Sequence, residues 1–463
     1  MTEPDAPTAH AWAALGGPPE LVERVAWTGA SGLHAVLPVR ELARATVATA
    51  SLAAAELLAQ RTGQAMADVR VDEGAVAVAF TSERHLRVDG RPIPLFAPLS
   101  GFWPSADGWV RTHANYPHHR ARLLAALGLA DSGDDAALVD RLRDAIAERP
   151  SVDVQEAAYA AGGLAVAVVP PGGHAAPLVT TTVGTRVTEP LLPATLPAEG
   201  VRVLDLTRVL AGPVATRTLA LLGADVLRVD APWLREDDGT HIDTGVGKRS
   251  TRLDLADPAD RATFERLLDA ADVVVTGYRP GALDRHGLGA EALLDRRPSL
   301  VVAQLCAWGW DDAWSGRRGF DSLVQAGTGI SMIEGADDGR PGALPAQALD
   351  HGTGYLLAAA VLRALTERST VGAGRLVRVS LAGTAAWLLA GIAPQPRPDL
   401  PAGDTERWVA ETKSAYGHLR YARSPLGVEG VPTDWARPPG RWGTDEPRWA
   451  RAGPAEGAAG LRR

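Results

Sequence analysis

Cysteine is almost absent from this sequence of 463 residues, which contains only Cys306. A single thiol excludes an intramolecular disulfide and any metal site built from several cysteines. Cys306 lies in the apolar run LVVAQLCAWGW. We therefore expect it to behave as a small, buried hydrophobic residue.

Positive charge is also scarce. The chain has 47 Lys and Arg residues against 55 Asp and Glu residues, which gives a formal net charge of -8. Lysine is nearly missing, with only Lys248 and Lys413. Because a nucleic-acid partner requires a basic surface, the charge balance argues against one.

Long hydrophobic runs are missing too. No stretch of about 18 uncharged apolar residues occurs, so we expect no membrane span. The first residues, MTEPDAPTAHAW, contain acids and lack the apolar core of a signal peptide. A cytoplasmic location is the expectation. Hydrophobic residues make up 46% and charged residues 22%, which is typical of a globular protein with two or three cores at this length.

From about residue 200 the sequence alternates between short apolar runs and segments with helical spacing. This alternation predicts a parallel sheet with crossover helices, which is the arrangement of an α/β domain. Asp257 and Pro258 are placed to begin one of the helices. The expected strands are 201–206, 224–232, 272–278 and 300–309, and the expected helices are 212–223 and 258–271.

The rest of the chain follows a different pattern. An Ala-rich helix is expected over 40–61, a strand and turn over 69–81, and two helices over 118–131 and 135–149. Three tryptophans, Trp435, Trp442 and Trp449, are expected to anchor irregular chain near the C-terminus. We place the boundaries at 1–182, a Pro/Thr-rich linker at 183–200, an α/β domain at 201–390 and a Pro/Gly/Trp-rich segment at 391–463.

The chain also contains an internal repeat. Residues 37–72 resemble residues 344–380: each runs from Leu-Pro through an Ala/Leu-rich helix to a polar turn and a VRV strand. The matches on both sides of the helix favour a duplication over chance similarity.

Six segments between 200 and 390 carry a resemblance to a known family. They are VLDLTRVLAGPVATRTLALLGADVLRVDAP, GKRSTRLDLADP, ADVVVTGYRPGALDRHGLG, GFDSLVQAGTGIS, LDHGTGYLLAAAVLRAL and GAGRLVRVSL. In this order the segments resemble the family III coenzyme A transferases (the CaiB/BaiF family), which include formyl-CoA transferase and carnitine CoA-transferase. The resemblance implies a doubly wound α/β domain with a smaller α+β domain, and two chains interlocked as rings.

The resemblance implies that Asp350 is the catalytic nucleophile. A carboxylate can attack a thioester and hold the acyl group as a mixed anhydride. The backbone amides of Gly352 and Gly354 are expected to support the developing oxyanion. The local sequence alone favours Asp350 as a residue that caps the following helix over Asp350 as a nucleophile.

The same resemblance implies a coenzyme A site. Arginines suit a ligand with several phosphates, although a family basic residue is replaced here by Ala231 and another by Ala256. Phe320 and Asp321 are expected at the acyl pocket. No tightly bound cofactor is expected; a coenzyme A thioester and a carboxylic acid are the substrates. The expected coenzyme A contacts are Arg208, Val209, Leu210, Ala211, Leu253, Tyr278, Arg279, Arg285 and His286.

Several histidines need a separate interpretation. His241, His351 and the pair His118–His119 lack metal-ligand spacing with a third donor, so no metal site is predicted.

The order of the halves is unusual for the family, because the segment that resembles a second half comes first. The N-terminal region therefore looks like a degenerate copy, with Ala43 or Ala45 opposite Asp350 and Glu41 matching neither register. We expect this region to be structural, and the protein to be either a monomer that resembles a fused dimer or an interlocked homodimer.

Two other functions stay open. An acyl-CoA racemase of the same fold needs a second acid/base, but Phe320 stands where that family has a histidine. A non-catalytic coenzyme A-binding subunit is the third alternative.

Overall fold

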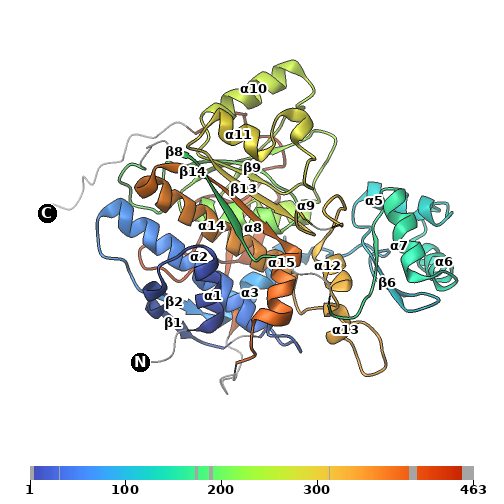
Figure 1. Ribbon diagram of the computed structural model, residues 1–463. Helices are drawn as coiled ribbons and strands as arrows, with labels where there is room; N and C mark the ends of the chain where they lie inside the picture. Colours follow the sequence, from blue (N-terminus) through green and yellow to red (C-terminus); the bar gives the residue numbers. More distant parts are fainter. Residues whose placement is uncertain are drawn as a thin grey trace.

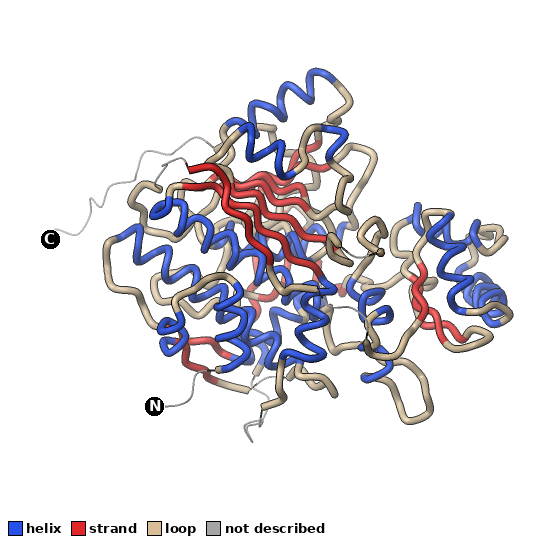
Figure 2. The backbone as a smooth tube through the Cα atoms, viewed as in Figure 1, coloured by secondary structure: helices blue, strands red, loops and turns tan. Residues whose placement is uncertain are grey.

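The computed structural model describes residues 5–30, 32–172, 176–186, 191–311, 313–395 and 404–450. A central twisted sheet lies between two layers of helices, and a smaller domain projects from one side (Figures 1 and 2). The predicted fold class, α/β with a doubly wound sheet and a smaller domain, is confirmed.

The central sheet has seven strands in the order β11-β10-β9-β12-β13-β14-β8. Its strands are parallel except β8, which pairs antiparallel with β14. The chain runs outward from β9 in one direction and from β12 in the other, so the order reverses between these two strands. Ligands of such sheets bind at this reversal, beyond the carboxyl ends of the strands. The bounds are β8 Thr180–Arg186, β9 Arg202–Leu206, β10 Asp225–Asp230, β11 Arg249–Arg252, β12 Val273–Thr276, β13 Val301–Cys306 and β14 Ala373–Ser380.

The two faces of the sheet belong to separate cores, because successive side chains of a strand point to opposite faces. On β9, Val203 joins the core under α8 (Ala211–Leu221) and α14 (Ala348–Val371), whereas Leu204 joins the core under α10 (Pro258–Asp269) and α11 (Ala290–Arg296). Figure 1 shows these helix pairs on opposite sides of the sheet. The helices that complete this region are α9 Asp238–Thr244, η2 Asp284–His286, α12 Asp321–Gly327, α13 Ile330–Ile333, α15 Leu381–Ala386 and η3 Trp387–Gly391.

Local signals explain several of these boundaries. Helix α10 begins as predicted, with Pro258 in its first turn and the Asp257 carboxylate accepting hydrogen bonds from the amides of Ala259 and Asp260. The expected turn after the strand at 69–72 is instead a helix, α3 (Glu73–Phe80). The Asp72 carboxylate accepts hydrogen bonds from the amides of Gly74 and Ala75, which satisfies the free end of that helix.

The N-terminal region contains a long helix, α2 (Val39–Thr62), that packs against α14. Strands β1 (Val25–Thr28) and β2 (Val69–Asp72) pair in parallel, and α2 connects them. By length and composition α2 is the described helix that is apolar enough to cross a membrane, but it is a core helix, mostly buried in the protein. The elements beside it are α1 Ala6–Ala14, η1 Pro19–Arg24 and α4 Ser82–His85.

Helices α2 and α14 match in detail, which corrects one sequence expectation. Both contain 24 residues, and each ends at a glycine in the left-handed conformation, Gly63 or Gly372. Counted from the first residue of each helix, Asp350 corresponds to Glu41, not to Ala43 or Ala45. The sequence alignment misplaced the register because the segments leading into the two helices differ in length.

The smaller domain contains the elements between residues 102 and 167. It contains a three-stranded antiparallel sheet, β5-β6-β7, covered by three helices around its own core. In Figure 1 it lies apart from the central sheet. Its elements are β5 Phe102–Pro104, β6 Trp109–Thr112, β7 Ala165–Ala167, α5 Pro117–Ala126, α6 Asp135–Ala147 and α7 Ser151–Ala160.

Two segments outside the predicted α/β domain contain regular structure. The expected linker at 183–200 begins inside β8, and the C-terminal segment forms a hairpin that pairs with the N-terminal region. The three C-terminal tryptophans do anchor the chain: the indole N–H groups of Trp435, Trp442 and Trp449 donate hydrogen bonds to groups of the α/β domain. The hairpin sheet contains β3 Arg87–Val88, β4 Arg91–Pro92, β15 Val409–Ser414 and β16 Gly417–Ala422, and η4 Thr405–Trp408 precedes it.

The close crossing of α14 and α8 gives a matched test of packing. A Cβ atom on Gly354 would lie 2.6 Å from the Ala211 carbonyl oxygen and 2.9 Å from Val214, whereas one on Gly352 would meet ordinary contacts at 3.5 Å or more. We expect Gly354→Ala to lower the free energy of unfolding by about 1–3 kcal/mol. Gly352→Ala should leave it unchanged or raise it by up to about 1 kcal/mol, because alanine favours a helix.

Urea denaturation followed by circular dichroism measures both variants. Equal stability of the two proteins would contradict the close crossing at Gly354.

Candidate active site

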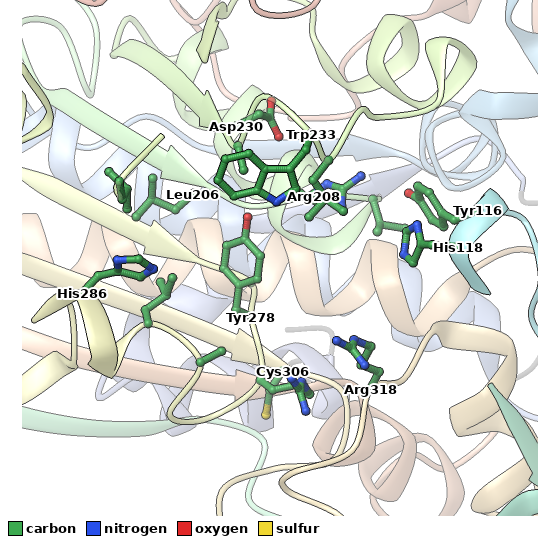
Figure 3. Close-up of a pocket in the computed structure, with 18 of the residues that line it drawn as sticks. Tyr116, His118, Leu206, Arg208, Asp230, Trp233, Tyr278, His286, Cys306 and Arg318 are labelled. Atoms are coloured by element: carbon green, nitrogen blue, oxygen red, sulfur yellow. The ribbon is translucent and has the colours of Figure 1, made fainter. Parts of the chain in front are cut away.

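A large cavity opens where the sheet predicts a ligand site. It has a volume of about 1180 Å³, and its lining includes residues at or just after the carboxyl ends of five parallel strands. Figure 3 shows Leu206, Asp230, Tyr278 and Cys306 around it. We call it the sheet cavity.

Most of the predicted coenzyme A contacts line the sheet cavity. Two predictions differ: Leu210 faces a second cavity, and Ala211 lines neither of them. Ala231 and Ala256, the positions without the family's basic residues, do lie on the wall. The predicted contacts that line this cavity are Arg208, Val209, Leu253, Tyr278, Arg279, Arg285 and His286.

The smaller domain supplies another wall that the sequence analysis missed. Its residues Tyr116, His118, His119 and Arg122 line the sheet cavity. Here the signal was the aromatic and basic run NYPHHRAR, which follows strand β6. Because Arg122 belongs to the smaller domain, the cavity is formed only when both domains are in place.

Two further wall residues suit a nucleotide. Trp233, just after β10, is 67% exposed at the cavity and presents a large aromatic surface. Arg318 lies across the cavity in Figure 3. Burial first, and then the positive charges of Arg279 and Arg122, lower the pKa of Arg318. Three mutually repelling guanidinium groups favour an anionic ligand between them.

The turn between β9 and α8 is held in a strained conformation. Val209 has a backbone φ of 69°, and a β-branched residue there costs about 1–3 kcal/mol. Its amide donates a hydrogen bond to the Glu236 carboxylate at 3.0 Å, which fixes the turn. Such strain often marks functional sites, and Val209 lines both cavities.

Glu236 is the centre of a buried charge network. Its carboxylate accepts hydrogen bonds from the Tyr116 hydroxyl at 2.5 Å and from Arg228 at 2.9 Å, in addition to the Val209 amide. Arg228 also pairs with Asp230 at 2.8 Å. Burial alone would raise the pKa of Glu236, but Arg228, Arg208 and the hydrogen bonds outweigh it and lower this pKa to about 2. The network therefore joins the strained turn, the sheet and the smaller domain.

Asp350 lines a second cavity of about 350 Å³, which we call the aspartate cavity. Asp350 lies in the first turn of α14, and its backbone amide donates a hydrogen bond to the Asp321 carboxylate at 3.0 Å. Burial first, and then the negative charges of Asp321 and Glu83, raise the pKa of Asp350 well above its ordinary value. Burial also raises the pKa of Asp321, to about 6. Asp321, not Asp350, is thus the residue that caps the helix.

The two glycines after Asp350 have a different role from the predicted one. Gly352 and Gly354 lie beyond the first turn of α14, where each amide donates to the carbonyl four residues earlier. Their amides are used by the helix, so the predicted oxyanion support is corrected. Gly354 instead lets α14 approach α8.

Residues from the N-terminal region and the smaller domain form the opposite wall. Glu83 and His113 line the aspartate cavity, so these parts of the chain are not merely scaffolding. The His113 ring stacks on Phe320 with centroids 3.7 Å apart. Burial and Arg111 lower the pKa of His113 to about 3, so the ring is neutral near pH 7. His351 does not line the cavity; it lies 3.7 Å from the Glu83 carboxylate behind the wall.

The two cavities meet at a common wall. Tyr116, Val209 and Phe320 line both of them. These three residues lie between the sheet cavity and the cavity that Asp350 lines.

Comparisons with known proteins agree with this geometry. Residues 198–421 match the model of CoA-transferase family III. The chain is 34% identical over 233 residues to a probable fatty acyl-CoA transferase, Rv3272, of Mycobacterium tuberculosis, covering 46% of this chain and 59% of the relative. It is 31% identical to human succinyl-CoA:glutarate CoA-transferase (42% and 48% covered) and 34% identical to formyl-CoA:oxalate CoA-transferase of Streptomyces avermitilis (40% and 47%).

Solved structures are similar over part of the chain. The crystal structure of Rv3272 matches with 37% identity and a TM-score of 0.40, covering 42% of this chain and 58% of that one. A CaiB/BaiF family protein from Brucella suis matches with 27% identity and a TM-score of 0.38, covering 48% and 65%. The chain spans about half the length of the curated relatives that it matches.

The Glu236 network predicts a pH-dependent stability. Because its folded-state pKa is lowered from 4.5 to about 2, the ionised carboxylate stabilises the fold fully above about pH 4.5. This contribution is lost as the pH falls toward 2. Glu236→Gln should lower the free energy of unfolding by about 3 kcal/mol at pH 7, and the difference from the parent should shrink between pH 4.5 and 2.

Urea titrations across this range test the prediction, with Glu156→Gln as control. Glu156 forms an exposed pair with Arg317, so its loss should change stability by less than about 1 kcal/mol. A pH-independent difference between the parent and Glu236→Gln would contradict the assignment.

Proposed function

We propose that the protein is a coenzyme A transferase that moves coenzyme A from an acyl-CoA to a carboxylic acid, with Asp350 as the nucleophile. The single observation that carries the proposal is that the two cavities share a wall, formed by Tyr116, Val209 and Phe320. The sheet cavity suits a nucleotide, and the carboxylate of Asp350 lies in the cavity next to it. The match of residues 198–421 to the model of CoA-transferase family III supports the same activity.

The proposed reaction has two matched halves. The Asp350 carboxylate attacks the thioester carbonyl carbon, the carbon–sulfur bond breaks, and the coenzyme A thiolate leaves a mixed anhydride. The thiolate then attacks the Asp350 carbonyl carbon, which releases the first acid and leaves an aspartyl-CoA thioester. The acceptor carboxylate attacks this thioester, and the same two steps in reverse order deliver the new acyl-CoA.

Several residues suit this chemistry. Phe320 and its stacking partner His113 exclude water beside Asp350, and a dry site protects an anhydride from hydrolysis. Burial first, and then the negative charge of Asp321, raises the pKa of Asp350, which makes its carboxylate a stronger nucleophile once ionised. The first turn of α14 supplies positive helix-end charge where the oxyanion develops.

The arrangement fits racemisation less well. A racemase needs a group that returns a proton to the α-carbon. Phe320 cannot do this, and His113, whose pKa is lowered to about 3, is uncharged near pH 7 and a poor acid. A subunit that only binds coenzyme A has no need of a buried carboxylate with a raised pKa that faces a cavity. A single chain that resembles a fused dimer is the assembly we favour, because α2 already occupies the place beside α14.

Replacement of the nucleophile is the first test. Asp350→Asn should abolish coenzyme A exchange, by at least a thousandfold, because an amide cannot form the anhydride. Mass spectrometry of the parent protein after incubation with acyl-CoA should show a covalent adduct on Asp350 that the variant lacks. Asp338→Asn, on an exposed loop, is the matched control and should retain full activity. Undiminished exchange by folded Asp350→Asn would remove the mechanism.

A second test separates transfer from racemisation. In heavy water, a 2-methylacyl-CoA should gain no deuterium at its α-carbon, because no acid is placed to return a proton there. A labelled free acid should instead enter the coenzyme A ester. Rapid α-deuteration without acid exchange would assign the protein to the isomerases.

A further inference from the structure

We propose that the aspartate cavity selects acyl groups that are apolar and carry no second charge, and that it rejects the acyl groups of dicarboxylic acids. The inference rests on the proposed function, which leaves the acyl group open. Two independent properties of the cavity wall support it: an apolar segment on one side and an excess of carboxylates around it.

The apolar segment is the loop between β4 and β5. Every residue of the run Ile93–Pro98 lines the cavity. Leu95 is 42% exposed and Phe96 is 41% exposed, so two large apolar side chains are left partly in contact with water. The Arg111 guanidinium lies over the Phe96 ring at 5.2 Å and holds it at the wall. An apolar acyl chain in the cavity would remove this surface from water, which is favourable.

The charges on the cavity wall also disfavour an acyl group that carries a second carboxylate. Five carboxyl groups line the cavity, and Arg84 is the one lysine or arginine side chain among its described lining residues. His113 is neutral near pH 7 because its pKa is lowered to about 3. A second carboxylate on the acyl group would therefore meet repulsion at close range, without a pair of donors such as an arginine fork directed at it. The five carboxyl groups belong to Glu83, Asp237, Asp243, Asp321 and Asp350.

The wall carboxylates are already fixed by the fold. Asp243 pairs with Arg217 at 3.3 Å and accepts a hydrogen bond from Ser82, and Asp237 caps α9. Arg84 follows Glu83 in sequence, and its charge acts on that carboxylate. This leaves Arg84 as the group to test as a rival anchor for a second carboxylate.

Binding of acyl-CoA esters to Asp350→Asn tests the proposal without relying on turnover. By calorimetry, hexanoyl-CoA should bind at least tenfold more tightly than succinyl-CoA. Affinity should rise from acetyl-CoA to hexanoyl-CoA, by up to about fourfold for each added methylene group. Adding Phe96→Ala should remove most of the gain from acetyl to hexanoyl and leave acetyl-CoA affinity within about twofold. The control is Leu192→Ala, because Leu192 is 78% exposed and lines neither cavity.

Succinyl-CoA binding as tightly as hexanoyl-CoA would overturn the inference, all the more if Arg84→Gln weakened succinyl-CoA alone. Turnover of the parent protein separates failure of the proposed acyl-group selection from failure of the proposed transferase activity. Faster exchange with succinate or glutarate than with hexanoate would reject the apolar selection and keep the transferase. Tighter binding of hexanoyl-CoA with no exchange into any acid would keep the selection and reject the transferase.

Discussion

The buried Glu236 carboxylate is the constraint on which the arrangement of both cavities depends. It binds the Val209 amide, the Arg228 guanidinium and the Tyr116 hydroxyl, which belong to the strained turn, to β10 and to the smaller domain. Tyr116 and Val209 are also two of the three residues shared by the cavities. One buried charge therefore holds two residues of the wall between the cavities and ties the smaller domain to the sheet. Removing one charged partner from such a cluster leaves the remaining charges buried without an opposite charge to pair with.

Helices α2 and α14 carry carboxylates at equivalent positions, and the neighbouring side chains give these two carboxylates different electrostatic surroundings. Glu41 and Asp350 occupy the same position in two helices of equal length. Glu41 lies 3.3 Å from the Arg40 guanidinium and accepts a hydrogen bond from the Gln395 amide. Asp350 lies beside the carboxylates of Asp321 and Glu83 and faces a cavity. The first carboxylate is neutralised in place, while the second keeps the basicity that a nucleophile needs.

The sequence predicted the elements whose signals are local. The alternating pattern placed the strands of the α/β domain, Asp257 and Pro258 marked the start of α10, and the family resemblance placed the residues that line the sheet cavity. The aspartate cavity was beyond such reasoning, because its walls join Glu83, His113 and Asp350, which are far apart in sequence. The roles of Gly352 and Gly354 were also missed, since only the start of α14 shows which amides the helix uses. Glu41 was misplaced because an alignment of Ala-rich helices has little to fix its register.

The covalent link between α2 and α14 has a consequence for how the site assembles. In an arrangement of two separate chains, the corresponding contact would be bimolecular, and dilution would weaken it. Here both helices belong to one polypeptide, so each is held near the other at a high effective concentration whatever the concentration of the protein. Residues between 83 and 116 line part of the aspartate cavity, and they belong to the same chain as Asp350. Formation of the contact between α2 and α14 is therefore a first-order process, and the two helices are free to diverge without the symmetry that two identical helices would impose.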